Sequence, residues 1–190
     1  MKLLLTDLEK DILLKIAREA IICAVKNMPL PPINLKNHLG LLREEGASFV
    51  TLTKLGKLRG CIGALEAFQP LILDVQEHAV AAALEDYRFP NVKLQEIEQI
   101  KIEVSRLTPT RPVNYSSPDE LIEKLRIGID GVLIKASGRR ATFLPQVWEK
   151  VPDPEQFLSQ LCMKMGAAPD LWRNNIIEVL TYQVEKFEEA

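Results

Sequence analysis

The segment Leu58–Gly63 carries groups whose types and spacing could do chemistry. It reads Leu-Arg-Gly-Cys-Ile-Gly. In a strand, alternation would project Arg59 and Cys61 from the same face, about 7 Å apart. A guanidinium near a thiol favours the thiolate, the nucleophilic form of cysteine. Gly60 and Gly63 weaken a strand and often mark a place where another backbone or a ligand comes close. Two interpretations stay open: a reactive Cys61, or a small Cys61 in a tight contact while Arg59 pairs with a carboxylate.

Two further side chains are weaker candidates for acid–base work. His78 lies on the apolar stripe of a predicted helix, where it is either a half-buried histidine with one hydrogen bond or a general base for Cys61. Glu103 lies on the polar face of a predicted strand, where it would either form a salt bridge with Arg59 or act as an acid–base group.

A polar cluster follows the same predicted helix. Asp86 at a helix end meets an unfavourable dipole unless a cation compensates, and Arg88 is the nearest candidate. The pair is either a structural clamp or, together with Phe89, part of a binding surface. Trp148 follows another predicted strand and would either hold two lobes together or line a cleft.

The composition limits the function classes. The chain has 190 residues, with 24 basic and 26 acidic side chains that nearly cancel. Such a balance argues against a general polyanion binder, although Lys54, Lys57, Arg59 and Arg88 could form a modest positive spot. Weak nucleic-acid binding therefore stays only as a minor alternative. The sequence also lacks a phosphate loop, a dinucleotide-binding glycine pattern and the common hydrolase motifs.

The cysteine content favours a reducing compartment, and the N-terminus gives no sign of export. Three separated cysteines, Cys23, Cys61 and Cys162, and only two histidines provide neither a disulfide framework nor a metal cluster. We expect Cys23 and Cys162 to be core residues, and we expect no metal and no cofactor. No stretch approaches the ~20 apolar residues of a membrane span, and the N-terminus is not typical of a signal peptide. We therefore predict a cytoplasmic protein without a membrane partner.

The first elements are a helix and a hairpin. A capping-box pattern at Thr6 and Glu9 predicts a helix over about 7–26. Its expected buried stripe comprises Leu8, Ile12, Ile16, Ala20 and Cys23. Strands over 47–53 and 57–65 are joined by a predicted three-residue loop with Gly56 left-handed. That loop sets Leu52 opposite Leu58, Val50 opposite Gly60, Thr51 opposite Arg59 and Phe49 opposite Cys61.

Helices and strands then interleave irregularly. We predict helices over 70–86, 117–125 and 154–165, a strand over 100–107, a hairpin of 128–136 with 140–144, and a last strand over 176–187. Ser117 is the expected N-cap of the second of these helices, with Pro118 at its first position. This pattern predicts an α+β fold with a mainly antiparallel sheet flanked by helices. The length suits one domain over 1–190, in which two lobes would not fold independently.

The chain resembles the AMMECR family, whose prokaryotic members are known as AmmeMemoRadiSam system protein A. The resemblance extends from Thr6 to Phe187, and its most specific marker is the hexapeptide Leu58–Gly63. Supporting matches lie at 86–90, 102–105, 128–132, 142–148, 157–158 and 161–162. The chain departs from the pattern at Ala64, where Thr often stands, and at Tyr87, where Pro often stands.

The resemblance implies a larger and a smaller lobe, with the hexapeptide near a cleft between them. It also implies genetic association with Memo-like and radical-SAM proteins, while the family has no established catalytic activity. Our first hypothesis is therefore an accessory domain that binds a partner protein or a small-molecule ligand through a cleft containing Arg59 and Cys61. The alternatives are a thiol-dependent enzyme with Cys61 as nucleophile and a weak nucleic-acid binder.

Overall fold

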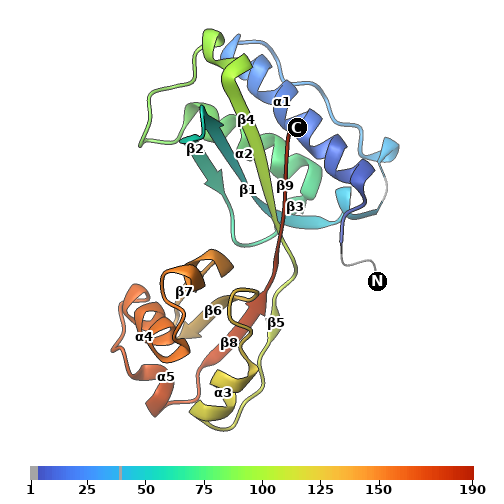
Figure 1. Ribbon diagram of the computed structural model, residues 1–190. Coiled ribbons are helices and arrows are strands. Elements are labelled where there is room, and N and C mark those ends of the chain that lie inside the picture. The colour runs from blue at the N-terminus through green and yellow to red at the C-terminus, as the bar shows by residue number, and fades with distance from the viewer. Residues whose placement is uncertain (1–3, 39) are drawn as a thin grey trace. The chain divides into compact units, whose positions relative to one another are not determined.

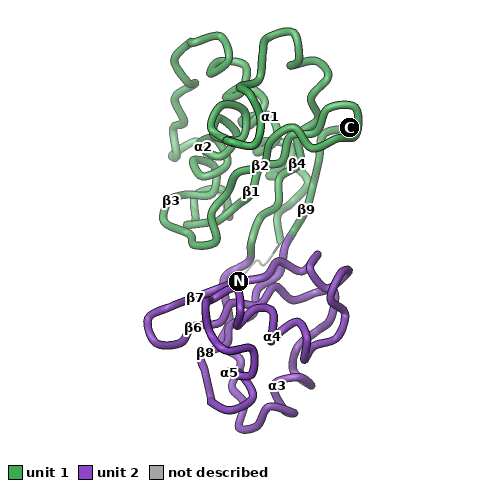
Figure 2. Tube along the Cα trace, turned by 90° about the vertical axis from the view of Figure 1, so that its left-hand side faces the viewer, with its two compact units in different colours: residues 1–107, 185–190 green, residues 108–184 purple. Residues whose placement is uncertain are grey.

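Two antiparallel sheets organise the computed structural model, which describes residues 4–38 and 40–190. The chain divides into unit 1, Met1–Leu107 with Glu185–Ala190, and unit 2, Thr108–Val184 (Figure 2). Helices accompany the sheet in each unit (Figure 1). The predicted α+β class with mainly antiparallel sheets is confirmed. Within the described residues, no helix combines the length and apolar content needed to span a membrane.

Unit 1 is a sheet with the strand order β2-β1-β4-β9 and two covering helices. Its core joins Leu13 of α1, Val75 of α2 and Val50 of β1 in one apolar cluster. Both helices therefore pack on the same face of the sheet. The elements are α1 (Asp7–Val25), η1 (Leu35–Asn37), η2 (Gly40–Leu42), β1 (Glu45–Lys54), β2 (Lys57–Gly63), β3 (Gln69–Pro70), α2 (Leu71–Leu84), η3 (Leu94–Gln99), β4 (Ile100–Leu107) and β9 (Val184–Glu188).

Helix α1 begins at the predicted capping box but buries a different stripe. The Thr6 hydroxyl accepts the Glu9 N–H at 3.3 Å, and the Glu9 carboxylate accepts the Thr6 N–H at 2.8 Å. The predicted stripe is wrong at its two ends, because Leu8 is 70% exposed and Cys23 is only half-buried, whereas Ala20 is buried as predicted. The buried face comprises Glu9, Leu13, Ala17, Ala20 and Ile21. Apolar residues surround much of this helix, so their periodicity alone does not identify the face that meets the sheet.

The β1–β2 hairpin has a two-residue turn and a bulge, so the predicted register is wrong. Leu55 and Gly56 form the turn with φ of 51° and 74°. The register pairs Thr53 with Leu58, Leu52 with Gly60, Thr51 with Cys61 and Phe49 with Gly63. Arg59 is therefore the extra residue of a bulge. The longer loop was predicted because a two-residue loop pairs Thr53 with Leu58 and exchanges the two faces of β2; the bulge at Arg59 restores the expected faces beyond it.

Gly60 is the point where α2 comes closest to the sheet. A Cβ at this position would lie 2.1 Å from the main-chain oxygen of Ala82. Because a backbone atom cannot move aside as a flexible side chain does, only glycine allows this approach. Gly60 lies opposite Leu52, which is fully buried, so the bulge leaves Gly60 on the helix side of the sheet.

Unit 2 is a four-stranded sheet with the order β5-β8-β6-β7 and its own apolar core. The Ser117 hydroxyl accepts the Glu120 N–H at 3.2 Å, which confirms the predicted N-cap. The elements are β5 (Arg111–Pro112), α3 (Pro118–Lys124), β6 (Gly131–Ala136), β7 (Arg139–Phe143), η4 (Pro145–Glu149), α4 (Pro154–Lys164), α5 (Leu171–Asn174) and β8 (Glu178–Tyr182).

The segment predicted as one strand over 176–187 is two strands in different sheets. β8 belongs to the sheet of unit 2 and β9 to that of unit 1. Between them Gln183 pairs with Thr108: its N–H donates to the Thr108 hydroxyl at 2.9 Å, and its carbonyl accepts the Thr108 N–H at 2.8 Å. The prediction of a single strand is wrong because side-chain alternation continues across the residue where the pairing partner changes.

Candidate functional site

The main chain of Cys61 is held by two side chains from the segment after α2. Its N–H donates to Asp86 Oδ2 at 2.8 Å, and its carbonyl accepts from Arg88 Nη2 at 3.1 Å. β2 is the first strand of its sheet, so the outward main-chain groups of an edge strand would otherwise lack ladder partners. Asp86 and Arg88 thus close the sheet edge at Cys61.

Asp86 and Arg88 form a bidentate ion pair. Arg88 Nε lies 2.8 Å from Asp86 Oδ1, and Nη2 lies 2.6 Å from Oδ2. The hydrogen bond from Arg88 holds the pKa of the buried Asp86 carboxyl well below its usual range. The same bond raises the pKa of Arg88. The ion pair is therefore a clamp, and it also holds the Arg88 guanidinium against the main chain of the hexapeptide.

Arg88 keeps an exposed edge despite these bonds. Its side chain is 43% exposed. Its hydrogen bonds use Nε and Nη2, so within residues 4–38 and 40–190 its Nη1 has no hydrogen-bond partner. The guanidinium carbon lies 5.6 Å from the centre of the Phe89 ring. Next to it, Tyr87 is 95% exposed.

Arg59 forms a second bidentate ion pair, with Glu96. Its Nε and Nη2 lie 3.2 and 3.0 Å from the two carboxylate oxygens, and Nη2 also donates to the Asn91 carbonyl at 3.3 Å. Lys54 Nζ reaches the same carboxylate at 2.9 Å. The hydrogen bond from Arg59, supported by Lys54, lowers the pKa of Glu96 to about 2. Glu96, which the sequence did not single out, is therefore the carboxylate partner of Arg59, and the predicted salt bridge between Arg59 and Glu103 is wrong.

The thiol of Cys61 lies on the sheet face opposite the helices, here called the far face. The residue is half-buried, and its sulfur lies 3.3 Å from the Thr51 hydroxyl. Thr51 pairs with Cys61 on one side and with Glu103 on the other, so the three side chains form a row across β2, β1 and β4. Glu103 lies 3.5 Å from Lys186. The structure thus brings Cys61 and Glu103 to one face, with Thr51 between them.

His78 lies on the helix side of the sheet. Its Nδ1 is 3.1 Å from Asp74 Oδ2, which also accepts the Ser48 hydroxyl at 2.6 Å. Ser48 shares strand parity with the buried Val50, whereas Cys61 pairs with Thr51 on the other face. Because the sheet separates them, the structure does not bring His78 to Cys61 as a general base.

Gly63 and Trp148, both predicted as binding residues, are closely packed by neighbouring groups of the fold. A Cβ at Gly63 would lie 2.3 Å from the Ser48 carbonyl oxygen and 2.5 Å from the Phe49 ring. Trp148 is only 2% exposed and stacks on Phe157, with ring centres 3.6 Å apart. Its Nε1 donates to the Asp130 carbonyl at 2.8 Å. Trp148 thus belongs to the core of unit 2, and its ring is covered.

The site residues therefore divide into those that meet around β2 and those that do not. Cys61, Asp86, Arg88 and Phe89 meet there through the contacts above. Arg59, on the same strand as Cys61, bonds instead to Glu96 of η3. Across the described parts of the chain, no three His, Cys, Asp or Glu side chains are grouped closely enough to hold a metal ion. Thr51, like Glu96, was missed, because its role depends on strand register and not on any local motif.

Similar proteins share nearly the whole chain. A protein of Methanothermobacter thermautotrophicus is 41% identical over 181 residues, covering 93% of this chain and 92% of that relative. Protein MJ0810 of Methanocaldococcus jannaschii is 38% identical over 161 residues, covering 83% and 80%. The crystal structure of the uncharacterized protein PH0010 from Pyrococcus horikoshii matches with a TM-score of 0.77 and 34% identity. That match covers 93% of this chain and 89% of that one.

The family match covers both units. The AMMECR1 family profile matches residues 14–187, which include the hexapeptide, the Asp86–Arg88 ion pair and the core of unit 2. The Methanothermobacter relative and the solved structure each cover 93% of the chain. The chain therefore belongs to the AMMECR1 family.

Proposed function

We propose that this chain is an accessory domain that binds a partner through the surface around Cys61, Tyr87 and Arg88, and that it works with Memo-like and radical-SAM proteins. One observation carries the proposal. Arg88 is fixed by its bonds to Asp86 and Cys61 yet is 43% exposed, and it stands beside a tyrosine that is 95% exposed. Arginine and tyrosine dominate the binding energy of protein interfaces, and a pre-ordered arginine loses little entropy on binding.

The chemistry of this surface defines what it would recognise. Arg88 Nη1 offers N–H donors that suit a carboxylate or another anionic group of the partner. The edge of β2 is already closed at Cys61, so a partner would contact side chains and would not add a strand there. The indirect support for Memo-like and radical-SAM partners is the resemblance of the chain to the family that is genetically associated with them.

A capture experiment with purified Memo-like and radical-SAM proteins from the same organism tests the proposal. Wild-type chain is compared with Tyr87→Ala and with Arg88→Gln. The matched control is Arg173→Gln, which removes an arginine that is 50% exposed in α5. We expect Tyr87→Ala and Arg88→Gln each to weaken capture about ten-fold or more, and Arg173→Gln to leave it unchanged. No capture by the wild-type chain, or equal capture by all four chains, would contradict the proposal.

A thiol-dependent activity is the second candidate, and the surroundings of Cys61 favour it. The Cys61 sulfur lies 3.3 Å from the Thr51 hydroxyl, Arg88 donates to the Cys61 carbonyl at 3.1 Å, and Glu103 on the same face as the sulfur is the candidate base. Mass spectrometry of Cys61 alkylation across pH tests this candidate. An activated thiol would react faster at neutral pH than a free-cysteine peptide and would slow in Arg88→Gln. A rate equal to that of the peptide would remove the basis for nucleophilic catalysis.

A further inference from the structure

One carboxylate, that of Glu96, holds together three chain segments that each carry an exposed leucine. Lys54 Nζ and Arg59 Nη2 lie 2.9 and 3.0 Å from its oxygens. The same carboxylate accepts the Lys93 N–H at 3.0 Å. Each of these three partners has an exposed leucine next to it in the chain; they are Leu55, Leu58 and Leu94, which are 82%, 46% and 50% exposed. The positions of the leucines are therefore fixed by a shared ion-pair network.

The β1–β2 turn and η3 lie at the same end of the sheet of unit 1. Lys54, the last residue of β1, pairs with Ile100, the first residue of β4, and η3 leads directly into that strand. The side chains of Arg59 and Glu96 are only 11% and 16% exposed, so their ion pair is a rigid support. Grouped exposed apolar residues mark interaction sites, whereas scattered ones do not. The three leucines, together with Lys57 and Lys93, are called the leucine patch below.

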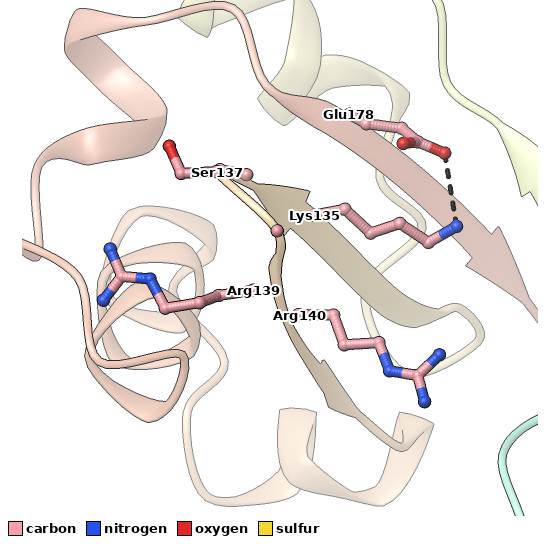
Figure 3. A pocket seen from close by; sticks show the side chains of 7 residues that line it. Lys135, Ser137, Arg139, Arg140 and Glu178 are labelled. Atoms are coloured by element: carbon pink, nitrogen blue, oxygen red, sulfur yellow. Dashed lines mark hydrogen bonds and ion pairs between the residues drawn. The ribbon is translucent and has the colours of Figure 1, made fainter.

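Leu55 occupies a turn position that does not suit leucine. The β6–β7 hairpin has the same two-residue turn: Ser137 and Gly138 have φ of 50° and 73°, against 51° and 74° for Leu55 and Gly56. Figure 3 shows Ser137 at the tip of that hairpin, among the residues that line a cavity. A leucine at this left-handed position strains the backbone and leaves its side chain in water. A partner that covers Leu55 would bury the side chain.

Two lysines of the leucine patch have no counter-charge. Throughout residues 4–38 and 40–190, the exposed side chains of Lys57 and Lys93 have no hydrogen bond or ion pair. In the β6–β7 hairpin, by contrast, Lys135 lies 3.4 Å from Glu178 (Figure 3). The segments 54–59 and 91–99 carry four basic and two acidic side chains, although the whole chain has a net charge of -2. The leucine patch therefore combines exposed apolar surface with an excess of positive charge.

We propose that the leucine patch binds an acidic amphipathic helix of a partner protein. The leucines would contact the apolar stripe of the helix, and Lys57 and Lys93 would contact carboxylates beside that stripe. Addition of a strand is disfavoured, because Arg59 interrupts the ladder of β2 and the edge at Cys61 is closed. A helix satisfies its own main-chain hydrogen bonds and needs no free sheet edge.

A partner protein fits this surface better than a second copy or a membrane. In a two-fold dimer the same positive surface would face itself, so like charges would meet. Anionic membranes attract clusters of about 4–8 lysines and arginines, whereas two of the four cations here are bonded to Glu96. The leucine patch shares no residue with the surface around Cys61, Tyr87 and Arg88, so either proposal can fail without the other.

Fluorescence anisotropy with three labelled helical peptides tests the proposal. Each peptide has about 20 residues, enough to form a helix alone, and the same leucine stripe, flanked by glutamate, glutamine or lysine. We expect the glutamate peptide to bind the full chain saturably, the glutamine peptide to bind several-fold more weakly and the lysine peptide not to bind. Leu94→Ser and Lys57→Glu should each weaken binding of the glutamate peptide about ten-fold or more. Lys57→Glu should also gain affinity for the lysine peptide.

Matched variants separate the leucine patch from general attraction. Leu8→Ser, at a leucine that is 70% exposed in α1, and Lys150→Glu, at an exposed lysine after η4, should bind the glutamate peptide as wild type does. Tyr87→Ala should also bind normally, which distinguishes this surface from the one around Cys61. Thermal melts identify any variant that loses its fold.

Several outcomes would overturn the proposal. They are no saturable binding of the glutamate peptide, equal affinity for the glutamate and lysine peptides, and equal affinity of the wild type and the two patch variants. Sedimentation that shows a dimer dissociated by Leu94→Ser would assign the leucine patch to a second copy instead. Binding to vesicles of anionic lipid that Leu94→Ser abolishes, without binding of the glutamate peptide, would assign it to a membrane.

Discussion

The Asp86 carboxylate accepts the main-chain N–H of Cys61 across 25 residues of sequence. A second bond joins the same two parts of the chain, this time with the donor on β2: Arg59 donates to the Asn91 carbonyl. Two arginines at this edge are each held by a carboxylate: Arg88 by Asp86, and Arg59 by Glu96. The segment from Asp86 to Glu96 is thus fastened along the outer edge of β2. This protects an edge strand from pairing with other chains and fixes the main chain that carries Cys61.

Replacing Asp86 should destabilise unit 1. Asp86→Ala leaves the Cys61 N–H without its acceptor and Arg88 without its counter-charge, and Asp86 is only 4% exposed. We expect a loss of about 1–3 kcal/mol in the free energy of unfolding, measured in urea. Asp11→Ala, at an exposed position of α1, is the control and should change stability by less than about 0.5 kcal/mol. Equal stability of the two variants would show that the clamp contributes nothing.

Acid should weaken the second ion pair. Hydrogen bonding from Arg59 lowers the pKa of Glu96 from 4.5 to about 2 in the folded chain. A depressed carboxyl pKa contributes stability that is present above the unfolded pKa and is lost as the pH falls through the folded pKa. Urea unfolding at a series of pH values between about 5 and about 2 should therefore show falling stability. Glu96→Gln should be less stable at the upper end and show a shallower slope; an unchanged slope would contradict this linkage.

Local signals in the sequence predicted much of the fold. Thr6 with Glu9 and Ser117 with Pro118 identified helix starts, because these caps involve residues within three positions of one another. The strand over 100–107 was predicted with its observed limits. Leu55 was not foreseen at positive φ, because nothing local marks a leucine for that conformation. The change of sheet at Gln183 was missed because pairing partners are distant in the sequence.

The site was predictable as a set of residues but not as a set of contacts. The hexapeptide places two glycines in a strand, and Asp86 stands at a helix end where its charge needs a cation such as Arg88, so the sequence identified both. The partners of Arg59 and His78, namely Glu96 and Asp74, were not identified. Glu96 lies 37 positions after Arg59, and many carboxylates could have filled its role. The packing of η3 and α2 determines which carboxylate meets Arg59 and which meets His78.

Gly60 should tolerate no side chain, whereas Gly56 should tolerate one at a modest cost. Gly60→Ala places a Cβ 2.1 Å from the Ala82 carbonyl oxygen, so α2 must move off the sheet. We expect a loss of about 3 kcal/mol or more in the free energy of unfolding. Gly56→Ala meets no atom within 4 Å and has only a left-handed φ of 74° to accommodate, at about 1 kcal/mol. Chemical denaturation of both variants measures the difference, and equal losses would refute the close approach of α2.

The buried group formed by Ser48, Asp74 and His78 should behave as one unit. Asp74 is fully buried; one of its oxygens accepts from Ser48 and contacts His78 Nδ1, while its Oδ1 has no hydrogen-bond partner among the residues described. Asp74→Ala should cost about 2–4 kcal/mol of unfolding free energy, because it leaves a buried hydroxyl and an imidazole unpaired. Ser48→Ala alone also loses a bond.

The double variant Ser48→Ala with Asp74→Ala separates this explanation from simple loss of packing. Once Asp74 is absent, removing the Ser48 hydroxyl also removes an unpaired polar group. The combined loss should therefore be smaller than the sum of the two single losses by about 1 kcal/mol. The control pair is Ser48→Ala with Asp11→Ala on exposed α1 surface, whose effects should add. Additive losses at Ser48 and Asp74 would mean that the hydroxyl and the carboxylate stabilise the fold independently.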